Sequence, residues 1–329
     1  MDKVNDIEKV VQIIKENQYF LLISHLYPDG DSLGSQTALH NLLKTMHKES
    51  YMLCADCLPY QYEFLPSVGE IKEGLDAVKP GVIPVAFFLD CADENRIGVD
   101  IDEIFKKSKI LINIDHHIKN TNFGDINIVD PYKAATSQII YDIIINGFPE
   151  FLNLEIGTGI YTGILTDTGK FQYENTTSAI HKIISHLLEF GIKPAYIYSK
   201  IYENEPFNRF KLLERVFERI NFIKEEGLIY SYVLQDDFID LGLPFSAQDG
   251  IIELLRSTKG VRIAALIKQI DDQQSKVSLR SSDNRINVAD LAVRFGGGGH
   301  RMAAAYSSTG KIDKITDELV LMVQNLEYE

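Results

Sequence analysis

The chain has 329 residues, of which 45% are hydrophobic, and carries a formal net charge of −14 at pH 7. This length suggests about two domains, each with enough apolar residues for a core of its own. The acidic balance argues against a long, sequence-independent grip on duplex DNA, which requires a basic face. A short anionic substrate is compatible with this charge.

Targeting signals are absent from the sequence pattern. No apolar run approaches 18 residues, and the charged N-terminal segment predicts a helix rather than a secretory signal. Three cysteines, an odd number, indicate a reducing compartment and no disulfide framework. We therefore expect a cytoplasmic protein without a membrane partner.

Predicted strands and helices alternate along residues 1–190. Helices are expected at 4–17, 32–47 and 177–190, the second capped by Asp31 or Ser32 and the third by Thr177. Strands are expected at 19–24, 51–54, 83–89 and 110–114. This alternation predicts a doubly wound, mostly parallel α/β sheet. Residues 191–224 look helical and charged and predict a connector between domains.

A smaller α+β domain is expected at residues 225–329. Strands are predicted at 228–234, 261–270 and 276–281, with a hairpin turn at 271–274. Helices are predicted at 247–256, at 288–295 and after His300. We expect the active site in the cleft between the two domains.

Acidic and imidazole side chains gather where the predicted strands of the first domain end, and a further Asp lies in a later segment. In an open α/β sheet the carboxyl ends of the strands meet at one crevice. The candidates are His25, Asp29, Asp31, Asp90, His116 and Asp167. Six such side chains are enough for two divalent ions, and imidazole with carboxylate suits Mn²⁺, Fe, Co or Zn²⁺ better than Ca²⁺.

Two metal ions about 3.5–4 Å apart can activate a hydroxide and stabilise both oxygens of an in-line displacement. The set therefore predicts hydrolysis of a phosphate ester or phosphoanhydride. Each residue alone has a plainer interpretation, because an Asp after a strand is often a helix cap and Pro28-Asp29-Gly30 is a common turn. The co-occurrence of four such segments in one half of the chain favours a site.

The second domain offers Arg280 and the run from Gly296 to Gly299, followed by His300 and Arg301. A glycine run before a helix lets backbone N–H groups approach a phosphate, and the helix N-terminus favours negative charge. His300 and Arg301 would add charge-assisted hydrogen bonds. The alternative is a flexible loop.

Taken together and in this order, the motifs resemble those of the DHH phosphoesterase family with its DHH-associated second domain, over nearly the whole chain. The segments are Ser24-His25-Leu-Tyr-Pro-Asp29-Gly-Asp31-Ser-Leu-Gly34-Ser35, Asp90 with Arg96 nearby, Asp115-His116-His117, Gly163-Ile-Leu-Thr-Asp167-Thr-Gly-Lys-Phe171 and Gly297-Gly-Gly-His300-Arg-Met-Ala303-Ala304. One departure is Ala305, where a glycine is often found. It falls inside the predicted helix, so we expect little effect.

The resemblance implies a role for each candidate. His25, Asp29 and Asp90 would hold one Mn²⁺. Asp31, Asp90, His116 and Asp167 would hold the second, with Asp90 bridging. His117 would face the substrate phosphate, and Asp115 would orient an imidazole. The substrate's terminal phosphate would bind Arg280, Gly297, Gly298, Gly299, His300 and Arg301.

Within the family, the compact layout resembles the branch of nanoRNases (oligoribonucleases) and pAp phosphatases. It implies a Mn²⁺-dependent exonuclease that hydrolyses short RNA or DNA oligonucleotides to 5′-mononucleotides, and pAp (3′-phosphoadenosine 5′-phosphate) to AMP. Two alternatives stay open: a phosphodiesterase of cyclic di-AMP or linear pApA, and a catalytically idle nucleotide-binding module. The intact set of ligands argues against the idle module. Substrate length, cleavage polarity, the metal and a homodimeric state stay open.

Overall fold

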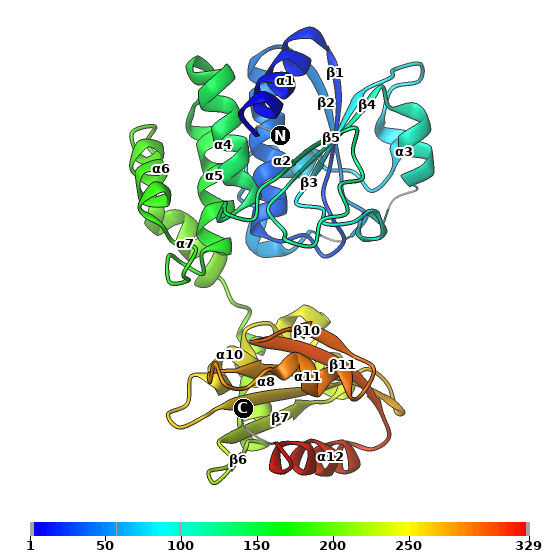
Figure 1. Cartoon of the computed structure of the whole chain (residues 1–329), viewed down its shortest axis with the longest axis vertical. Helices are drawn as coiled ribbons and strands as arrows, with labels where there is room; N and C mark the ends of the chain where they lie inside the picture. Colours follow the sequence, from blue (N-terminus) through cyan, green and yellow to red (C-terminus); the bar gives the residue numbers. More distant parts are fainter. Residues whose placement is uncertain (1–2, 57, 99–100, 327–329) are drawn as a thin grey trace. The chain divides into compact units, whose positions relative to one another are not determined.

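The computed structural model describes residues 3–56, 58–98 and 101–326. The chain divides into two compact units, Met1–Asn204 and Glu205–Glu329 (Figure 1). The predicted fold class is confirmed, because a parallel α/β unit is followed by a smaller unit with its own sheet. The segment predicted as a connector is shared: helix α7 (Pro194–Tyr202) belongs to the first unit and helix α8 (Phe207–Glu218) to the second.

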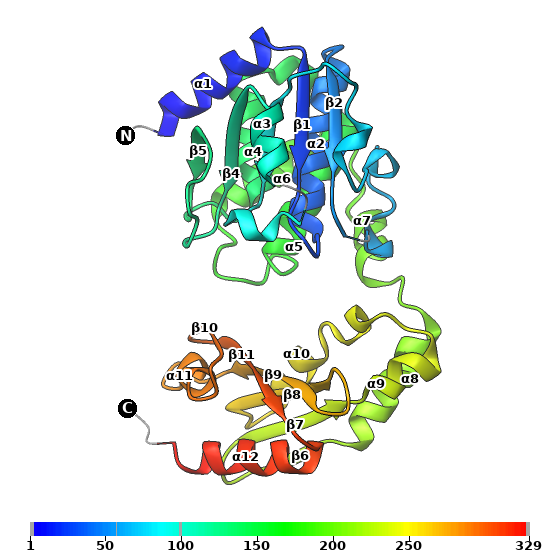
Figure 2. The same cartoon turned by 90° about the vertical axis from the view of Figure 1, so that its right-hand side faces the viewer.

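Five parallel strands form the sheet of the N-terminal unit, in the order β2-β1-β3-β4-β5. They are β1 (Tyr19–Ile23), β2 (Glu49–Leu53), β3 (Val85–Leu89), β4 (Ile110–Asp115) and β5 (Ile126–Val129). Because the strands are parallel, their carboxyl ends lie along one edge of the sheet (Figures 1 and 2).

Helices cover both faces of this sheet, as a doubly wound fold requires. Phe20 and Leu22 of β1 belong to the larger core and Leu21 and Ile23 to the smaller one, because successive side chains of a strand point to opposite faces. The larger core lies under α1, α2, α4 and α5, and the smaller one under α3. The helices are α1 (Lys3–Glu16), α2 (Gly30–Thr45), α3 (Ile101–Lys107), α4 (Thr136–Gly147), α5 (Leu154–Asp167), α6 (Ser178–Leu188) and α7. Short 3₁₀ turns lie at Tyr60–Tyr62, Val68–Glu70, Leu75–Ala77, Glu94–Arg96 and Pro149–Phe151.

Helices α2 and α5 pack unusually close together through glycines. A Cβ atom at Gly34 would lie 2.5 Å from the Gly159 carbonyl oxygen, and one at Gly159 would lie 2.6 Å from the Gly34 oxygen. Neither position accepts a side chain without moving backbone. This approach sets the first turn of α2 beside the last turn of α5.

Helix starts were predicted with mixed success. Thr177 caps α6 as predicted. The prediction that Asp31 or Ser32 caps α2 is wrong, because Asp29 is the cap and accepts hydrogen bonds from the backbone N–H groups of both, each at 3.0 Å. Asp31 is thereby left inside the first turn, with its carboxylate free for other contacts.

The C-terminal unit has a six-stranded mixed sheet in the order β10-β11-β9-β8-β7-β6, in which only β7 and β8 run parallel. The strands are β6 (Asn221–Ile223), β7 (Leu228–Val233), β8 (Ile263–Gln269), β9 (Gln274–Ser281), β10 (Gly298–His300) and β11 (Ala303–Thr309). One face packs on α11 and α12 and the other on α8, α9 and α10 (Figure 2). The helices are α8, α9 (Gln235–Leu241), α10 (Ile251–Arg256), α11 (Val288–Val293) and α12 (Ile312–Gln324).

The predicted helix after His300 is wrong, because the chain there turns into strand β11 and pairs with β10 and β9. Ala304 and Tyr306 alternate into the core, so packing overrides the helical preference of the alanine run. Ala305 therefore lies on a strand. The glycine run leads into β10, so no helix N-terminus stands there to favour a phosphate.

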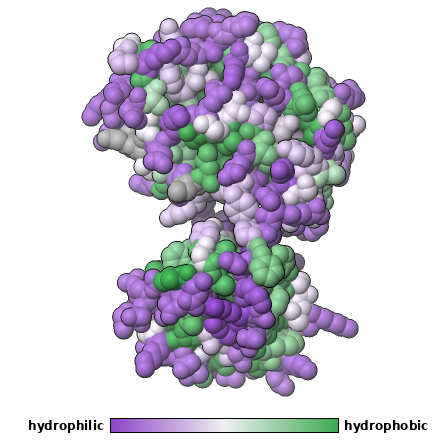
Figure 3. Space-filling model, turned by 180° about the vertical axis from the view of Figure 1, so that it is seen from behind, coloured by the Kyte–Doolittle hydropathy of each residue, from purple (hydrophilic) through white to green (hydrophobic). Residues whose placement is uncertain are grey.

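The predicted helix at 247–256 is interrupted at Gly250, which has a φ of 81°. A 3₁₀ turn (Phe245–Gln248) precedes it and α10 follows. No helix among the described residues is long and apolar enough to cross a membrane. On the face shown in Figure 3, hydrophobic side chains are interspersed with hydrophilic ones on both units.

Candidate active site

Six side chains from four segments converge at the carboxyl edge of the parallel sheet. The structure brings together all six candidates: His25, Asp29, Asp31, Asp90, His116 and Asp167. They form overlapping groups whose potential ligand atoms lie within 4.8 Å of one another. One group is His25, Asp29 and Asp90, a second is Asp31, His116 and Asp167, and a third is Asp90, His116 and His117.

Asp90 is shared by the first and third groups, and His116 by the second and third. Asp90 directly follows β3, and its Oδ2 lies 3.5 Å from His25 Nε2 while its Oδ1 lies 3.6 Å from His116 Nε2. Its backbone is left-handed, with a φ of 61°. Such a conformation is strained for a residue with a Cβ atom, and strain of this kind concentrates at functional sites.

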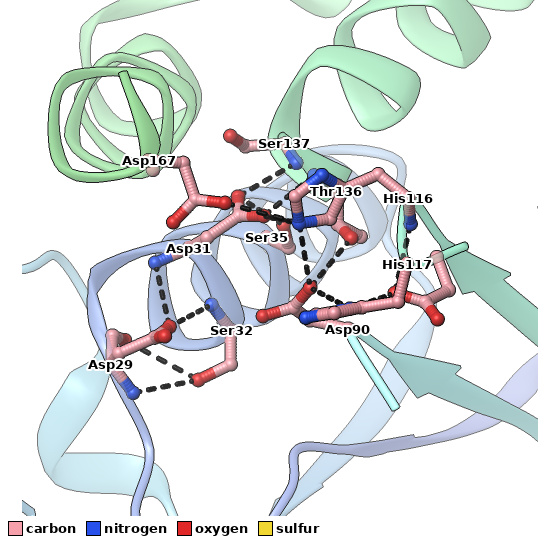
Figure 4. A network of polar contacts seen from close by, with 12 residues as sticks. Asp29, Asp31, Ser32, Ser35, Asp90, His116, His117, Thr136, Ser137 and Asp167 are labelled. Carbon is pink, nitrogen blue, oxygen red and sulfur yellow. Dashed lines mark hydrogen bonds and ion pairs between the residues drawn. The ribbon is translucent and has the colours of Figure 1, made fainter. Parts of the chain in front are cut away.

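Asp31 is fully buried and is held by the start of α4. Its Oδ2 accepts a hydrogen bond from the Thr136 N–H at 2.6 Å, and its Oδ1 accepts one from the Ser137 N–H at 2.9 Å. The Thr136 hydroxyl donates to Asp90 Oδ1 at 2.9 Å. The start of α4 therefore fixes two of the acidic side chains, since free N–H groups at a helix N-terminus favour negative charge (Figure 4).

Asp167 is the last residue of α5 and enters the cluster from that helix. This candidate therefore ends a helix rather than a strand. Its Oδ2 lies 3.0 Å from His116 Nε2, and the same nitrogen lies 4.0 Å from Asp31 Oδ2. In Figure 4, Asp31, Asp90, Asp167 and His116 point toward a common centre.

Asp31 and Asp90 of this cluster are buried, Asp167 is partly buried and Asp29 is exposed. Burial raises the pKa of Asp31 and of Asp90, and Asp31 adds to the effect on Asp90 by repulsion. Burial and then Asp31 raise the pKa of Asp167 to about 7. Burial opposes the charged form of His116, but the hydrogen bond to Asp167 and the charge of Asp31 raise its pKa to about 9. The site thus favours a bound positive charge.

Asp115 lies behind this cluster. Its Oδ1 accepts hydrogen bonds from the His116 N–H at 2.8 Å and from His117 Nδ1 at 2.7 Å, and its Oδ2 accepts one from Asn120 at 2.6 Å. Burial would raise the pKa of Asp115, but the hydrogen bonds from His117 and Asn120 lower it below its usual value. Asp115 therefore orients the ring of His117, which is 40% exposed.

Thr136, Ser137 and Asn120 belong to the site although they were not among the candidates. The Thr-Ser pair before the mostly apolar segment Ile139–Ile145 is typical of a helix start, and this signal could have predicted α4. Gly163 was part of a motif, but its role appears only in three dimensions. A Cβ atom there would lie 2.3 Å from Ser137 Oγ and 2.5 Å from Asp31 Oδ1.

The donor set fits hard-to-borderline divalent cations. It combines carboxylate oxygens with imidazole nitrogens and contains no thiolate, which suits Mn²⁺ and related ions. Asp31 and Asp90, which are buried, and Asp167, which is partly buried, have raised pKa values and no Lys or Arg among their described ion-pair partners. Buried charges in proteins are normally paired or coordinate metals.

The candidates of the C-terminal unit lie on its own sheet. His300 of β10 pairs with Ala303 of β11, which pairs with Arg280 of β9, so His300 and Arg280 flank Ala303 on one face. Arg280 Nε contacts Glu253 Oε1 at 3.0 Å. Arg301 donates two hydrogen bonds to the Asn284 carbonyl oxygen, at 2.9 and 2.6 Å.

The glycines beside this face allow a close chain crossing. A Cβ atom at Gly297 would lie 2.3 Å from the Ala305 oxygen, and one at Gly299 would lie 2.5 Å from the Ala303 oxygen. Gly298 is exposed, and a Cβ atom there would meet nothing within 4 Å.

Comparison with known proteins assigns the family. Residues 20–164 match the N-terminal domain of the DHH family, and residues 225–325 match the DHHA1 domain. The chain therefore belongs to the DHH phosphoesterase family, as its motifs predicted.

Individual proteins of known name are similar to this chain over most of its length. The bifunctional oligoribonuclease and PAP phosphatase NrnA of Thermus thermophilus is 31% identical over 94% of this chain and 89% of that protein. The cyclic-di-AMP phosphodiesterase GdpP of Geobacillus thermodenitrificans is 25% identical over 89% of this chain but only 45% of that protein. An exopolyphosphatase-related protein from Bacteroides fragilis has the same fold, with a TM-score of 0.87 at 24% identity over 98% of this chain and 96% of that one.

Proposed function

We propose that the protein is a divalent-metal-dependent phosphoesterase that hydrolyses short RNA oligonucleotides to 5′-mononucleotides and pAp to AMP, with Mn²⁺ as its metal. The observation that carries the proposal is the sharing of Asp90 between two groups of acidic and imidazole side chains. The similarity to NrnA over nearly the full length of both chains supports this substrate class.

The residues suit two adjoining cation sites. His25, Asp29 and Asp90 would hold one ion, and Asp31, Asp90, His116 and Asp167 would hold the other. A bound pair of divalent ions supplies an activated hydroxide and neutralises the charge that develops on a phosphoryl group.

The remaining groups of the site position the reactants. Thr136 and Ser137 fix the carboxylates of Asp90 and Asp31, so these need not reorganise during the reaction. Asp115 holds Nδ1 of His117 and leaves its other ring nitrogen directed away from this contact. His117, which is partly exposed, would donate a hydrogen bond to the substrate phosphate from that nitrogen.

The C-terminal unit would bind the end of the substrate. Arg280 is paired with Glu253, a contact that a substrate phosphate could replace with a stronger bidentate one. His300 lies across Ala303 from Arg280, and the space beside Gly298, where a side chain would lie, is open. This arrangement supports phosphate recognition by side chains rather than by a helix N-terminus.

A second candidate function is hydrolysis of cyclic di-AMP or linear pApA. The similarity to GdpP favours it, but that match covers less than half of GdpP. One assay separates these functions: the purified protein with Mn²⁺ is presented with pAp, a dinucleotide, a pentamer, a 24-mer and cyclic di-AMP. We expect pAp and the short RNAs to be hydrolysed, with no turnover in chelator.

The control for this assay is Asp31→Asn, which removes charge from the centre but keeps the side-chain shape. Exclusive turnover of cyclic di-AMP would replace the proposed function with the second one. No turnover of any substrate by the metal-loaded protein would instead indicate an idle nucleotide-binding module.

A further inference from the structure

A cleft of about 370 Å³ lies in the N-terminal unit between the turn that follows Asp167 and helix α7. Its lining includes Phe171, Tyr198 and Leu165, and Lys170 and Glu203 provide its charged groups. In Figure 1, α7 and the C-terminal end of α5 lie at the same end of the unit as the carboxyl ends of the strands. The functional site described above does not use this cleft.

The turn that forms one wall is conformationally strained. Gly169, Lys170 and Phe171 have φ values of 55°, 64° and 64°, so three consecutive residues are left-handed. This backbone is unfavourable for the two that carry side chains. Hydrogen bonds hold it: the Lys170 N–H donates to the Leu165 oxygen at 2.9 Å, and the Phe171 N–H donates to Thr168 Oγ1 at 3.2 Å. The strain begins two residues after Asp167 and fixes the side chains at the cleft.

Lys170 stands over aromatic rings rather than beside a carboxylate. Its Nζ lies 4.1 Å from the ring centroid of Tyr202 and 5.9 Å from that of Tyr198, and the two rings are 5.1 Å apart. No ion pair involves Lys170 within the described residues. Burial raises the pKa of Tyr202, and the nearby Tyr173, Tyr198 and Asp167 raise it further. Lys170 follows Asp167 by three residues, so the aromatic group lies against the turn that leaves the proposed metal centre.

We propose that this cleft binds the nucleobase of the nucleotide whose phosphate lies at the metal centre. Tyr198 and Phe171 provide π-faces, and stacking of this kind tolerates any base. Lys170 can donate a hydrogen bond to the edge of the base, and Glu203 can accept one. The inference rests on the proposed function, because it takes a nucleotide as the substrate.

A fluorescent base analogue tests the cleft without any turnover. The full chain with Mg²⁺ is titrated with 2-aminopurine ribonucleoside 5′-monophosphate, whose fluorescence is quenched by stacking. We expect saturable quenching and a loss of affinity of about tenfold or more in Tyr198→Ala. Tyr198→Phe should retain the affinity, because it keeps the aromatic face.

The matched control is Tyr196→Ala, on the same helix. Tyr196 is 50% exposed and does not line the cleft, so this variant should bind like the unaltered protein. Ribose 5-phosphate should compete poorly with the analogue, since it lacks a base. Equal affinity of Tyr198→Ala and Tyr196→Ala, or equally good competition by ribose 5-phosphate, would overturn the base site.

Kinetics separate the failure of this inference from the failure of the proposed function. Tyr198→Ala should raise KM for a dinucleotide, whereas Tyr196→Ala should leave this KM unchanged. If the Tyr198→Ala variant and the unaltered protein hydrolyse the dinucleotide equally well, the base site is refuted and the phosphoesterase stands. If the unaltered protein does not hydrolyse the dinucleotide, the proposed function fails, and the fluorescence titration still decides whether the cleft binds a base.

Discussion

At the scale of single residues, Asp90 combines two features that oppose folding. Its backbone is left-handed, and its buried carboxylate lies among those of Asp31, Asp29 and Asp167. Both are unfavourable in the protein without metal, because strain and like-charge repulsion add to the cost of burial. A cation bound between the carboxylates would turn the repulsion into attraction, so stability and function are opposed at this residue.

The change Asp90→Asn tests this opposition. Asn tolerates the left-handed backbone, so the substitution removes charge without adding strain. In chelator we expect the variant to melt at a higher temperature than the unaltered protein. Added Mn²⁺ should stabilise the unaltered protein but not the variant. Hydrolysis should fall by about 10³-fold or more.

Asp93→Asn, three residues further along the same loop, is the control and should change none of these quantities. Asp93 caps the turn at Glu94–Arg96, and Asn can accept the same hydrogen bond. Near-unaltered turnover by Asp90→Asn would contradict a two-ion centre.

The sequence predicted the acidic and imidazole members of the site because their residue types are unusual where strands end. It did not predict Thr136 and Ser137, whose types are ordinary at a helix start. Their contacts with Asp31 join positions 105 and 106 residues apart, and no local pattern records such a distance. Residues that carry the chemistry are therefore easier to predict than those that position them.

At the scale of elements, the distance between α2 and α5 controls the geometry of the site. Gly34 and Gly159 let the two backbones touch, and these helices carry Asp31 and Asp167. A larger residue at the crossing would have to push the helices apart, which would separate the two carboxylates.

Gly159→Ala should therefore destabilise the N-terminal unit by about 1–3 kcal/mol, as overpacking does, and should also weaken Mn²⁺ binding. Gly157→Ala, on the same helix, is the matched control. Its Cβ would meet only side-chain ends that can move, those of Ile192 and Leu187. Because alanine favours a helix by about 1 kcal/mol, the effect should be neutral or stabilising. Urea unfolding measures the stability of both variants, and a Mn²⁺ titration measures how tightly each binds the metal. Equal effects of the two variants would show that the crossing is not tight.

Asp237 joins two helices of the C-terminal unit. It is buried in α9, and its carboxylate contacts Arg219 and Arg215 of the segment around α8 and accepts a hydrogen bond from the Leu234 N–H at 2.8 Å. Burial would raise the pKa of Asp237, but Arg219 and the Leu234 N–H lower it below its usual value. Its contribution to stability is thus present above the unfolded pKa of about 3.9 and is lost as the pH falls through the lower folded value.

Asp237→Asn should destabilise the C-terminal unit by about 1–3 kcal/mol at pH 7, because a charged hydrogen-bonded partner of two guanidinium groups is removed. The difference from the unaltered protein should shrink as the pH is lowered below about 3.9. Asp240→Asn is the control, since Asp240 contacts Arg215 but is 58% exposed, and such pairs contribute little. Denaturant unfolding over a pH series checks this. A pH-independent difference would contradict an ionic role.

The elements that were predicted correctly are those whose local pattern agrees with their packing. Strand β9 alternates exposed and buried residues, and α6 has an apolar stripe, a Thr cap and a glycine past its end. The alanine run in β11 was predicted to be a helix because alanine favours helices. Pairing with β9 and β10 makes it a strand instead. Short elements such as β5, with four residues, carry too little pattern to be recognised.

At the scale of the whole molecule, the charge of −14 shapes what the protein can bind. A long nucleic acid is repelled by an acidic surface unless a basic track guides it. The proposed anchors are few: the metal centre, the base cleft and the face that carries Arg280 and His300. These anchors can recognise two or three nucleotides, and further nucleotides would gain no contact among them.

We therefore expect RNAs of two to five nucleotides to exceed a 24-mer in kcat/KM by about tenfold or more, which corresponds to about 1.4 kcal/mol. Because few phosphates would contact cationic side chains, log kcat/KM should also fall only gently with log salt. A slope of about −1.4 would correspond to two phosphate contacts on a single strand. Arg280→Ala should flatten this slope by about 0.7, whereas Arg285→Ala, an exposed arginine already paired with Asp283 in the same unit, should leave it unchanged. Equal efficiency on the 24-mer together with a steep salt dependence would instead indicate a long electrostatic track and a processive exonuclease.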